Sequence, residues 1–135
     1  MQPAYVLALD AGGRGGRCLI ADAESGRLFR AFRPWSLKPA PGGGIDVDLP
    51  LVWERLCEAA REAMDAAGAR PEQVLGIAAT SIRHSTIVLD RGGTALMSAS
   101  NRDSRAMIEA MEIGAGNASE LYRRTGHWPG PLCAA

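Results

Sequence analysis

The sequence lacks several features that mark common classes of protein. It has no excess of charge, because 15 Lys and Arg balance 15 Asp and Glu, and this balance argues against an electrostatic binder of nucleic acid. Its three cysteines, Cys18, Cys57 and Cys133, form no Cys-x-x-Cys pair, so we expect reduced thiols. No apolar run reaches membrane-spanning length, and nothing at the N-terminus has the pattern of a signal peptide. We therefore expect a cytoplasmic protein with neither nucleic acid nor membrane as a partner.

The best-known phosphate-binding motifs are also missing. A P-loop places Lys and then Ser or Thr after its last glycine and begins a helix, but Arg17 and Cys18 follow the glycines here. The dinucleotide fingerprint G-x-G-x-x-G also begins a helix, and its spacing is absent. A phosphate site at the glycines of this chain would therefore be of another type.

What the sequence does contain is a glycine-rich turn between two short apolar segments, residues 5–10 and 17–22. Both segments have the length of strands, since a helix needs a longer periodic run. The four glycines between positions 12 and 16 permit positive φ angles and close approach of a ligand, and successive N–H groups in such a turn can bind an anion. Asp10 ends the first strand, where it can face a phosphate-bound metal ion, and Arg14 and Arg17 add positive charge. The stretch predicts either a phosphate-binding β-hairpin or an ordinary glycine-rich one.

The next residues predict a third strand, a loop and a helix. The strand is expected over residues 27–33, and a mobile loop over residues 34–44 because of the prolines and glycines there. Asp48 is the predicted cap of a helix that ends at about Ala67, before Gly68. Its apolar side chains recur at three- and four-residue spacing and predict a core-facing stripe, made of Leu49, Trp53, Leu56, Ala60, Ala63, Met64 and Ala67.

The second half of the chain predicts further strands and helices. Residues 74–81 are typical of a buried strand, polar residues interrupt at 82–85, and shorter strands are expected at 86–90 and 94–97. A helix then follows, capped by Asn101 or Asp103. Its expected inner face is Met107, Ala110 and Met111, and a last short helix is expected from Ala118 to Arg124, with Asn117 as its cap. The 135 residues fit one domain, with three antiparallel strands in an α/β mixed sheet.

Three stretches, taken in this order and at these separations, resemble the N-terminal part of the FGGY carbohydrate kinases. They are Asp10-Ala11-Gly12 with Arg17, then Ser81-Ile82-Arg83-His84, then Asn101-Arg102-Asp103-Ser104-Arg105. The acidic residues before Trp53 are also similar to the family, and the second and third stretches resemble most the branch that phosphorylates autoinducer-2. The resemblance covers essentially residues 1–135. It implies the ribonuclease-H-like fold of actin and hexokinase.

The resemblance also implies a reaction and a set of site residues. The reaction is transfer of the γ-phosphoryl group of ATP, with Mg²⁺, to a hydroxyl of a sugar or polyol. Asp10 would lie near the Mg²⁺ and the phosphates. The phosphate loop would contain Gly12, Gly13, Arg14 and Arg17, and the sugar pocket would be lined by Arg83, His84, Asn101 and Asp103. Positioning and neutralisation of charge are most of what phosphoryl transfer requires of a protein.

Each of these side chains also has a structural interpretation. Arg83 and His84 fit a solvated strand end, whereas Asn101 and Asp103 fit helix caps, and Asp103 also fits an ion pair with Arg105. His127 and Trp128 resemble loop packing, and we assign them no function.

The sequence departs from the family in two respects. Gly13 stands where family members usually carry Thr, and the sequence ends at Ala135, before the catalytic aspartate and the C-terminal domain of the family. We therefore expect residues 1–135 to be a truncated N-terminal domain that is inactive alone and self-associates through its exposed apolar face. The alternatives are a non-catalytic sugar- or phosphate-binding module or split-complex subunit on the same fold, and an unrelated α/β domain with a chance glycine hairpin.

Overall fold

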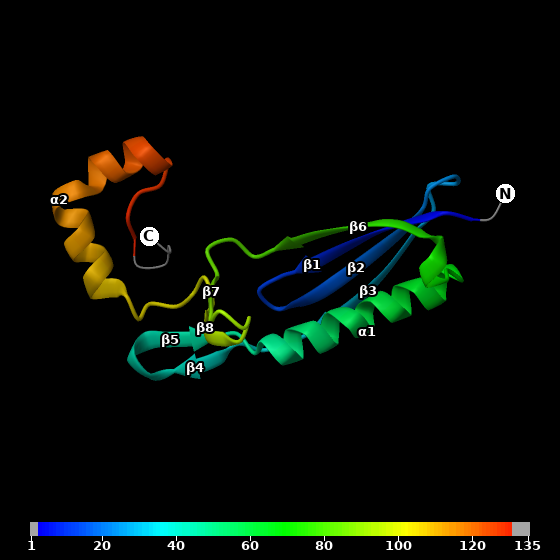
Figure 1. The fold of residues 1–135 in the computed structure, drawn as a ribbon, viewed down its shortest axis with the longest axis horizontal. Coiled ribbons are helices and arrows are strands. Elements are labelled where there is room, and N and C mark those ends of the chain that lie inside the picture. Colours follow the sequence, from blue (N-terminus) through cyan, green and yellow to red (C-terminus); the bar gives the residue numbers. More distant parts are fainter. Residues whose placement is uncertain (1–2, 131–135) are drawn as a thin grey trace. The chain divides into compact units, whose positions relative to one another are not determined.

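The computed structural model describes residues 3–130, which divide into two units (Figure 1). Unit 1 contains residues up to 36 together with 48–82, and unit 2 contains residues 37–47 together with those from 83 onward. Within the described residues, no helix combines the length and the apolar character needed to cross a membrane.

Unit 1 is built on a four-stranded sheet with the strand order β3-β2-β1-β6. The strands are β1 (Tyr5–Ala11), β2 (Gly15–Asp22), β3 (Leu28–Pro34) and β6 (Val74–Ser81). β1 pairs antiparallel with β2 and β2 antiparallel with β3, whereas β6 runs parallel to β1. The sheet is therefore mixed, as expected for an α/β fold.

Helix α1 (Leu49–Ala67) covers one face of this sheet (Figure 1). Asp48 caps its first turn by accepting a hydrogen bond from the Leu51 N–H at 3.2 Å. Gly68 ends the helix in the left-handed conformation, with φ of 65°. Both ends of the helix thus lie where the sequence predicted them, and a short 3₁₀ turn at Pro71–Gln73 leads into β6.

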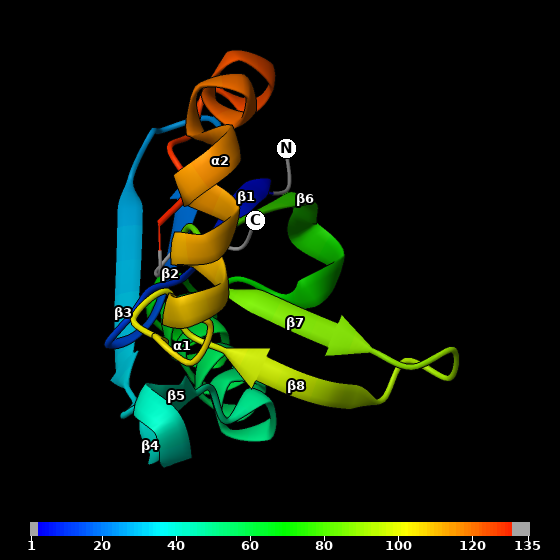
Figure 2. The same ribbon diagram turned by 90° about the vertical axis from the view of Figure 1, so that its left-hand side faces the viewer.

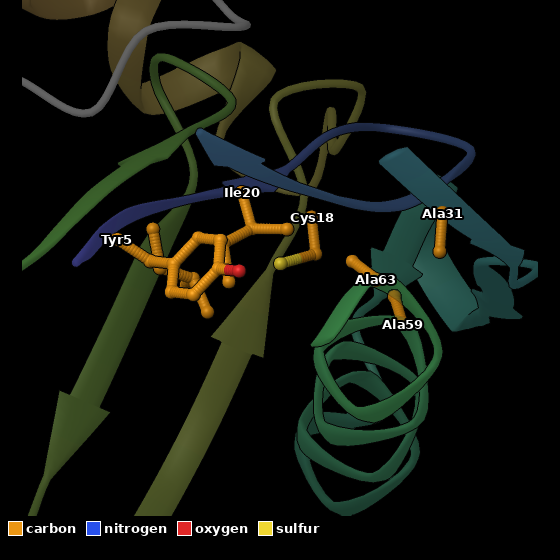
Figure 3. Close-up of a cluster of buried hydrophobic side chains, with 7 residues drawn as sticks. Tyr5, Cys18, Ile20, Ala31, Ala59 and Ala63 are labelled. Atoms are coloured by element: carbon orange, nitrogen blue, oxygen red, sulfur yellow. The ribbon is translucent and has the colours of Figure 1, made fainter. Parts of the chain in front are cut away.

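The core of unit 1 lies between α1 and β1–β3 (Figure 3). Two alanines one turn apart, Ala59 and Ala63, let the helix backbone approach the sheet closely, and both are fully buried. The sheet contributes Tyr5, Leu7, Cys18, Ile20 and Ala31. The Tyr5 hydroxyl is satisfied at the edge of this core, because it donates to the Ala67 carbonyl at 3.2 Å.

Two sequence predictions about burial in unit 1 are wrong. Trp53 was expected in the core-facing stripe, but it is 67% exposed. The reason is that the face of α1 that packs on the sheet is centred on Ala59, and Trp53 lies outside that face. β6 was expected to be buried, yet Leu75 and Ile77 are largely exposed. The reason is that α1 packs mainly on β2 and β3, so no described element covers β6.

Unit 2 contains a second four-stranded sheet, with the order β4-β5-β8-β7. Its strands are β4 (Lys38–Ala40), β5 (Gly44–Asp46), β7 (Thr86–Leu89) and β8 (Ala95–Ala99), and β7 and β8 form a hairpin (Figure 2). The mobile loop predicted over residues 34–44 is therefore wrong. A 3₁₀ turn at Pro41–Gly43 joins β4 to β5, with positive φ at Gly42 and Gly43, so the glycines make a tight connection here.

Helix α2 (Met107–Thr125) corrects three further expectations. It is one continuous helix, because Asn117 is an interior residue and caps nothing. Its N-cap is Ala106 without a side-chain hydrogen bond, so neither Asn101 nor Asp103 caps it. Of its expected inner face, Ala110 is buried, whereas Met107 and Met111 are exposed. Gly126 ends the helix with φ of 74°.

Candidate functional site

The turn between β1 and β2 is closed by a hydrogen bond from the Gly12 N–H to the Gly15 carbonyl at 3.1 Å. None of its glycines has a positive φ, so the expected use of left-handed glycine is wrong. Steric contact explains the glycines instead. A Cβ on Gly15 would lie 2.4 Å from the Phe32 ring, and one on Gly16 would lie 2.6 Å from Leu56.

The tip of this turn presents backbone donors that have no acceptor among the described residues. The Gly13 and Arg14 N–H groups form no hydrogen bond with any residue that the structure describes, whereas the Arg14 carbonyl accepts from the Trp35 N–H at 3.2 Å. A Cβ on Gly13 would lie 2.9 Å from Ile82 Cδ1. The apolar end of Ile82 therefore lies close to where a larger side chain at position 13 would begin.

Asp10 and Arg17 lie opposite each other at the end of the β1–β2 pair. Arg17 Nη1 donates to Asp10 Oδ2 at 2.9 Å, and the side chains remain 63% and 38% exposed, respectively. The Arg17 guanidinium also lies 5.3 Å from the centroid of the Phe32 ring, and this cation–π contact stabilises the positive charge of the guanidinium. Both residues line a hollow of about 640 Å³ in unit 1, together with Thr80.

These groups fit the phosphate end of a nucleotide and a hydrated Mg²⁺. Free N–H groups and guanidinium groups are suitable donors to phosphate oxygens, and the glycines leave the backbone open. Mg²⁺ usually keeps several waters and takes one or two carboxylates together with substrate phosphates. The part of the chain that the structure describes has no cluster of three or more potential metal ligands, so Asp10 suits a single carboxylate contact made directly or through water.

The other predicted site residues lie in unit 2, at one end of the β7–β8 hairpin. Thr86, the first residue of β7, pairs with Ala99, the last residue of β8. Arg83 and His84 precede this pair and Asn101 follows it, so the strand register brings the two sequence motifs to the same end. His84 has φ of 60°, a conformation that costs an L-residue about 1–2 kcal/mol.

Asp103 is held by an arrangement that the sequence only partly predicted. Arg105 donates to its carboxylate through Nε at 2.9 Å and Nη2 at 2.6 Å, and the Ile45 N–H of β5 donates at 2.7 Å. Arg105 Nη2 also donates to Asp46 at 2.5 Å. We call Asp46, Asp103 and Arg105 the carboxylate clasp, because they join β5 to the turn before α2. The ion pair of Asp103 with Arg105 was predicted, but the part of Asp46 was missed, since a partner 59 residues away leaves no local signal.

The clasp changes the acidity of Asp103. The hydrogen bonds from Arg105 lower the pKa of Asp103 to about 2, with a further contribution from the Ile45 N–H. The two carboxylates raise the pKa of Arg105 in turn. The Asp103 side chain is only 11% exposed, and both its oxygens accept hydrogen bonds within the chain. Asn101 is less engaged, because the one hydrogen bond of its side chain with a described residue is a long one from the Ser100 hydroxyl at 3.4 Å.

Comparison with known proteins identifies the family of the chain. The chain belongs to the FGGY family of carbohydrate kinases, because residues 5–133 match the N-terminal domain of that family. It is 31% identical over 128 residues to the autoinducer-2 kinase of Escherichia coli O9:H4, and 31% identical over 111 residues to that of Yersinia pseudotuberculosis. These alignments cover 90% and 81% of this chain, but 24% and 21% of the relatives. The chain thus spans about a quarter of the length of the curated relatives it matches.

Solved structures agree with this assignment. A structure described as a xyloylose kinase from Brucella ovis aligns with a TM-score of 0.79 at 25% identity, over 96% of this chain and 27% of its own. The glycerol kinase of Plasmodium falciparum, solved with ADP, aligns with a TM-score of 0.80 at 18% identity, over 98% of this chain and 27% of its own. The second likeness shows the fold alone.

Proposed function

We propose that this chain supplies the phosphate loop and part of the sugar site of an ATP-dependent carbohydrate kinase on the ribonuclease-H-like fold. Asp10, Gly12, Gly13, Arg14 and Arg17 would contact the phosphates of Mg²⁺-ATP, and the acceptor would be a hydroxyl of a sugar or polyol. The observation that carries this proposal is the Asp10–Arg17 pair beside backbone N–H groups that have no described acceptor. Bound Mg²⁺-ATP supplies the phosphoryl group, and these residues orient it and balance its charge.

The sugar would be bound at the end of the β7–β8 hairpin by Arg83, His84 and Asn101. Their polar groups include donors and acceptors that match hydroxyl groups, and Arg83 forms no ion pair with a residue that the structure describes. Asp103 was expected to contact the sugar as well. Because its oxygens accept bonds from Arg105 and Ile45, we propose that it instead holds the turn that carries Asn101.

A chimera tests the kinase function directly. The chain would replace the matching N-terminal segment of the E. coli autoinducer-2 kinase, and ADP release would be measured with Mg²⁺-ATP and a panel of polyols, ketoses and the autoinducer-2 precursor. We expect sugar-dependent release by the chimera and none by the chain alone. Asp10→Asn should lower kcat about 100-fold or more, the usual effect of losing one group that stabilises the transition state.

The matched control is Glu24→Gln, which removes a carboxylate from the exposed turn after β2 and should leave kcat unchanged. A folded chimera that releases no ADP, or one in which Asp10→Asn retains full activity, would contradict the proposal.

One observation favours a second candidate, a binding module without catalysis. Position 13 has no hydroxyl, and Ile82 Cδ1 lies where a larger side chain would begin. Such a module would bind sugar or phosphate without turnover, so binding without ADP release in the same chimera would support it.

We also propose that the chain alone self-associates. The sheet face opposite α1 supports this proposal, because it carries apolar side chains that are partly exposed, namely those of Val6, Leu19 and Phe32.

A further inference from the structure

We propose that His84 and His127 form one two-imidazole site that hydrogen-bonds the hydroxyl groups of a sugar or polyol. The choice of ligand rests on the proposed function, and the inference adds His127, to which the sequence assigned no role. The two ring centroids lie 5.6 Å apart, with the ring planes at 90°. His84 lies before β7 and His127 after α2, so the fold of unit 2 brings them together.

The position of His127 is fixed by the end of α2. Gly126 turns the chain with φ of 74°, and the Thr125 hydroxyl then accepts a hydrogen bond from the His127 N–H at 3.1 Å. The same hydroxyl lies 2.7 Å from the Leu121 carbonyl, to which it donates. The backbone of His127 is therefore tied to the last turn of the helix.

Two apolar contacts hold the residues that follow against the same helix. Trp128 stacks on Tyr122, with ring centroids 4.8 Å apart and planes 19° from parallel. Pro129 packs beside Gly114, where an added Cβ would lie 3.4 Å from its ring. Residues 127–129 thus lie along α2, and His127 is presented to His84 by a supported segment.

His84 is held in a conformation that needs an explanation. It is the one described residue other than glycine with a positive φ. The next residue, Ser85, has a hydroxyl that is buried without a described hydrogen-bond partner. Two unfavourable features at adjacent residues are typical of a segment that is shaped for a functional contact.

The ring nitrogens of both histidines remain available to a ligand. Neither imidazole forms a hydrogen bond with a residue that the structure describes, and each neutral ring offers one donor and one acceptor. Neighbouring hydroxyls of a polyol offer the same two functions, so they match the pair. A metal ion fits less well, because the described residues provide no third His, Cys, Asp or Glu to complete such a site.

Nuclear magnetic resonance of the chain tests this site, because the sequence has two histidines and therefore two Cε1–H signals. A nuclear Overhauser effect between the rings would verify the pairing without ligand. The chain would then be titrated separately with glycerol, D-xylulose and D-gluconate. We expect both signals to shift with one shared Kd for at least one of these compounds.

A variant separates ligand contact from ring packing. His127→Phe keeps an aromatic ring edge-on to His84 but removes the ring nitrogens, so we expect Kd to rise about fivefold, the effect of one lost hydrogen bond. Met111→Leu changes a largely exposed side chain of α2 and is the control, with an unchanged Kd.

Independent shifts of the two signals, no shift with any of the three compounds, or an unchanged Kd in His127→Phe would overturn the site. The kinase function is judged separately by the chimera. Sugar-dependent ADP release without histidine shifts would refute the two-imidazole site alone, whereas shared shifts without ADP release would refute the kinase function and leave the site intact.

Discussion

Unit 1 buries apolar side chains between α1 and its sheet, whereas unit 2 joins its strands to a turn with charged side chains. In unit 1, Ile20 and Cys18 are fully buried beneath Ala59 and Ala63, and this packing supports the strands that carry Asp10 and Arg17. Burial of apolar area on this scale is the main favourable term in folding. The candidate phosphate loop therefore extends from a packed sheet.

Unit 2 has little comparable packing. Among its described residues, the buried hydrophobic side chains are Ala99 and Ala110, and large apolar residues such as Leu96 and Ile108 are 68% and 69% exposed. Its best-connected feature is the carboxylate clasp. The two candidate sites therefore depend on different interactions, so the stability of unit 1 should respond to changes of side-chain volume and that of unit 2 to changes of charge and pH.

The largest expected effect is that of a cavity in unit 1. Ile20→Ala removes a fully buried side chain and should lower the free energy of unfolding of unit 1 by about 3 kcal/mol. Ile108→Ala, in α2 of unit 2, removes the same atoms from a side chain that is 69% exposed and should change stability by less than about 0.5 kcal/mol. Hydrogen exchange of amides in β2 and α2 measures the two effects. Equal losses of stability in the two variants would mean that unit 1 does not depend on apolar packing more than unit 2 does.

An intermediate effect is expected from opening the carboxylate clasp. Arg105→Met removes the hydrogen bonds to Asp103 and should raise the pKa of Asp103 from about 2 toward its ordinary value, as read from the carboxyl ¹³C shift. The loss of these charged hydrogen bonds should destabilise the turn by about 2 kcal/mol, visible as faster exchange of the Ile45 amide. Amides of unit 1 should not change.

The same clasp predicts a pH dependence whose sign follows from the lowered pKa of Asp103. The pKa of Asp103 is lower in the folded chain than in the unfolded chain. As the pH falls, the unfolded chain therefore takes up a proton first, and the folded state loses stability relative to it. The contribution to stability is therefore complete above about pH 4 and disappears as the pH falls toward 2. Arg105→Met should weaken this dependence at the Ile45 amide, because the side-chain hydrogen bonds of Arg105 are the largest cause of the lowered pKa. Arg123→Met is the control, because its pair with Glu120 is largely exposed and contributes little.

The parts of the fold that could be predicted are those with a local cause. Asp48 and Gly68 mark the ends of α1 because capping depends on a few adjacent residues, and β1, β2 and β3 follow from short apolar runs and turns. The motifs that mark the family were equally visible, because they are contiguous in sequence.

The parts that could not be predicted depend on partners distant in the sequence. The spacing of apolar residues places Trp53 on the stripe of α1. It cannot predict which part of that stripe packs on the sheet, and the contact is made around Ala59. Asn117 has the side chain of a helix cap, yet α2 continues through it. The pairing of His84 with His127 and the hydrogen bond from Arg105 to Asp46 likewise arise from tertiary contacts that no local pattern encodes.

The smallest expected effect on stability is that of adding side-chain volume to the candidate phosphate loop, the turn between β1 and β2 in unit 1. Gly13→Thr adds a Cβ that would start 2.9 Å from Ile82 Cδ1. That atom is the mobile end of its side chain, so a small displacement relieves the contact and the loss of stability should be about 1 kcal/mol. A urea unfolding curve of each variant measures it.

The double variant Gly13→Thr with Ile82→Val makes the cause of this loss explicit. Ile82→Val removes the Cδ1 methyl that the new side chain would meet, so the two changes together should cost less than their sum, with a coupling of about 0.5 kcal/mol or more. Gly76→Thr paired with Ile82→Val is the reference, because the space around Gly76 is open and its φ is not positive, so its coupling should be zero. Additive losses at position 13 would mean that Ile82 does not limit that site, and that volume does not explain the glycine at the tip of this turn.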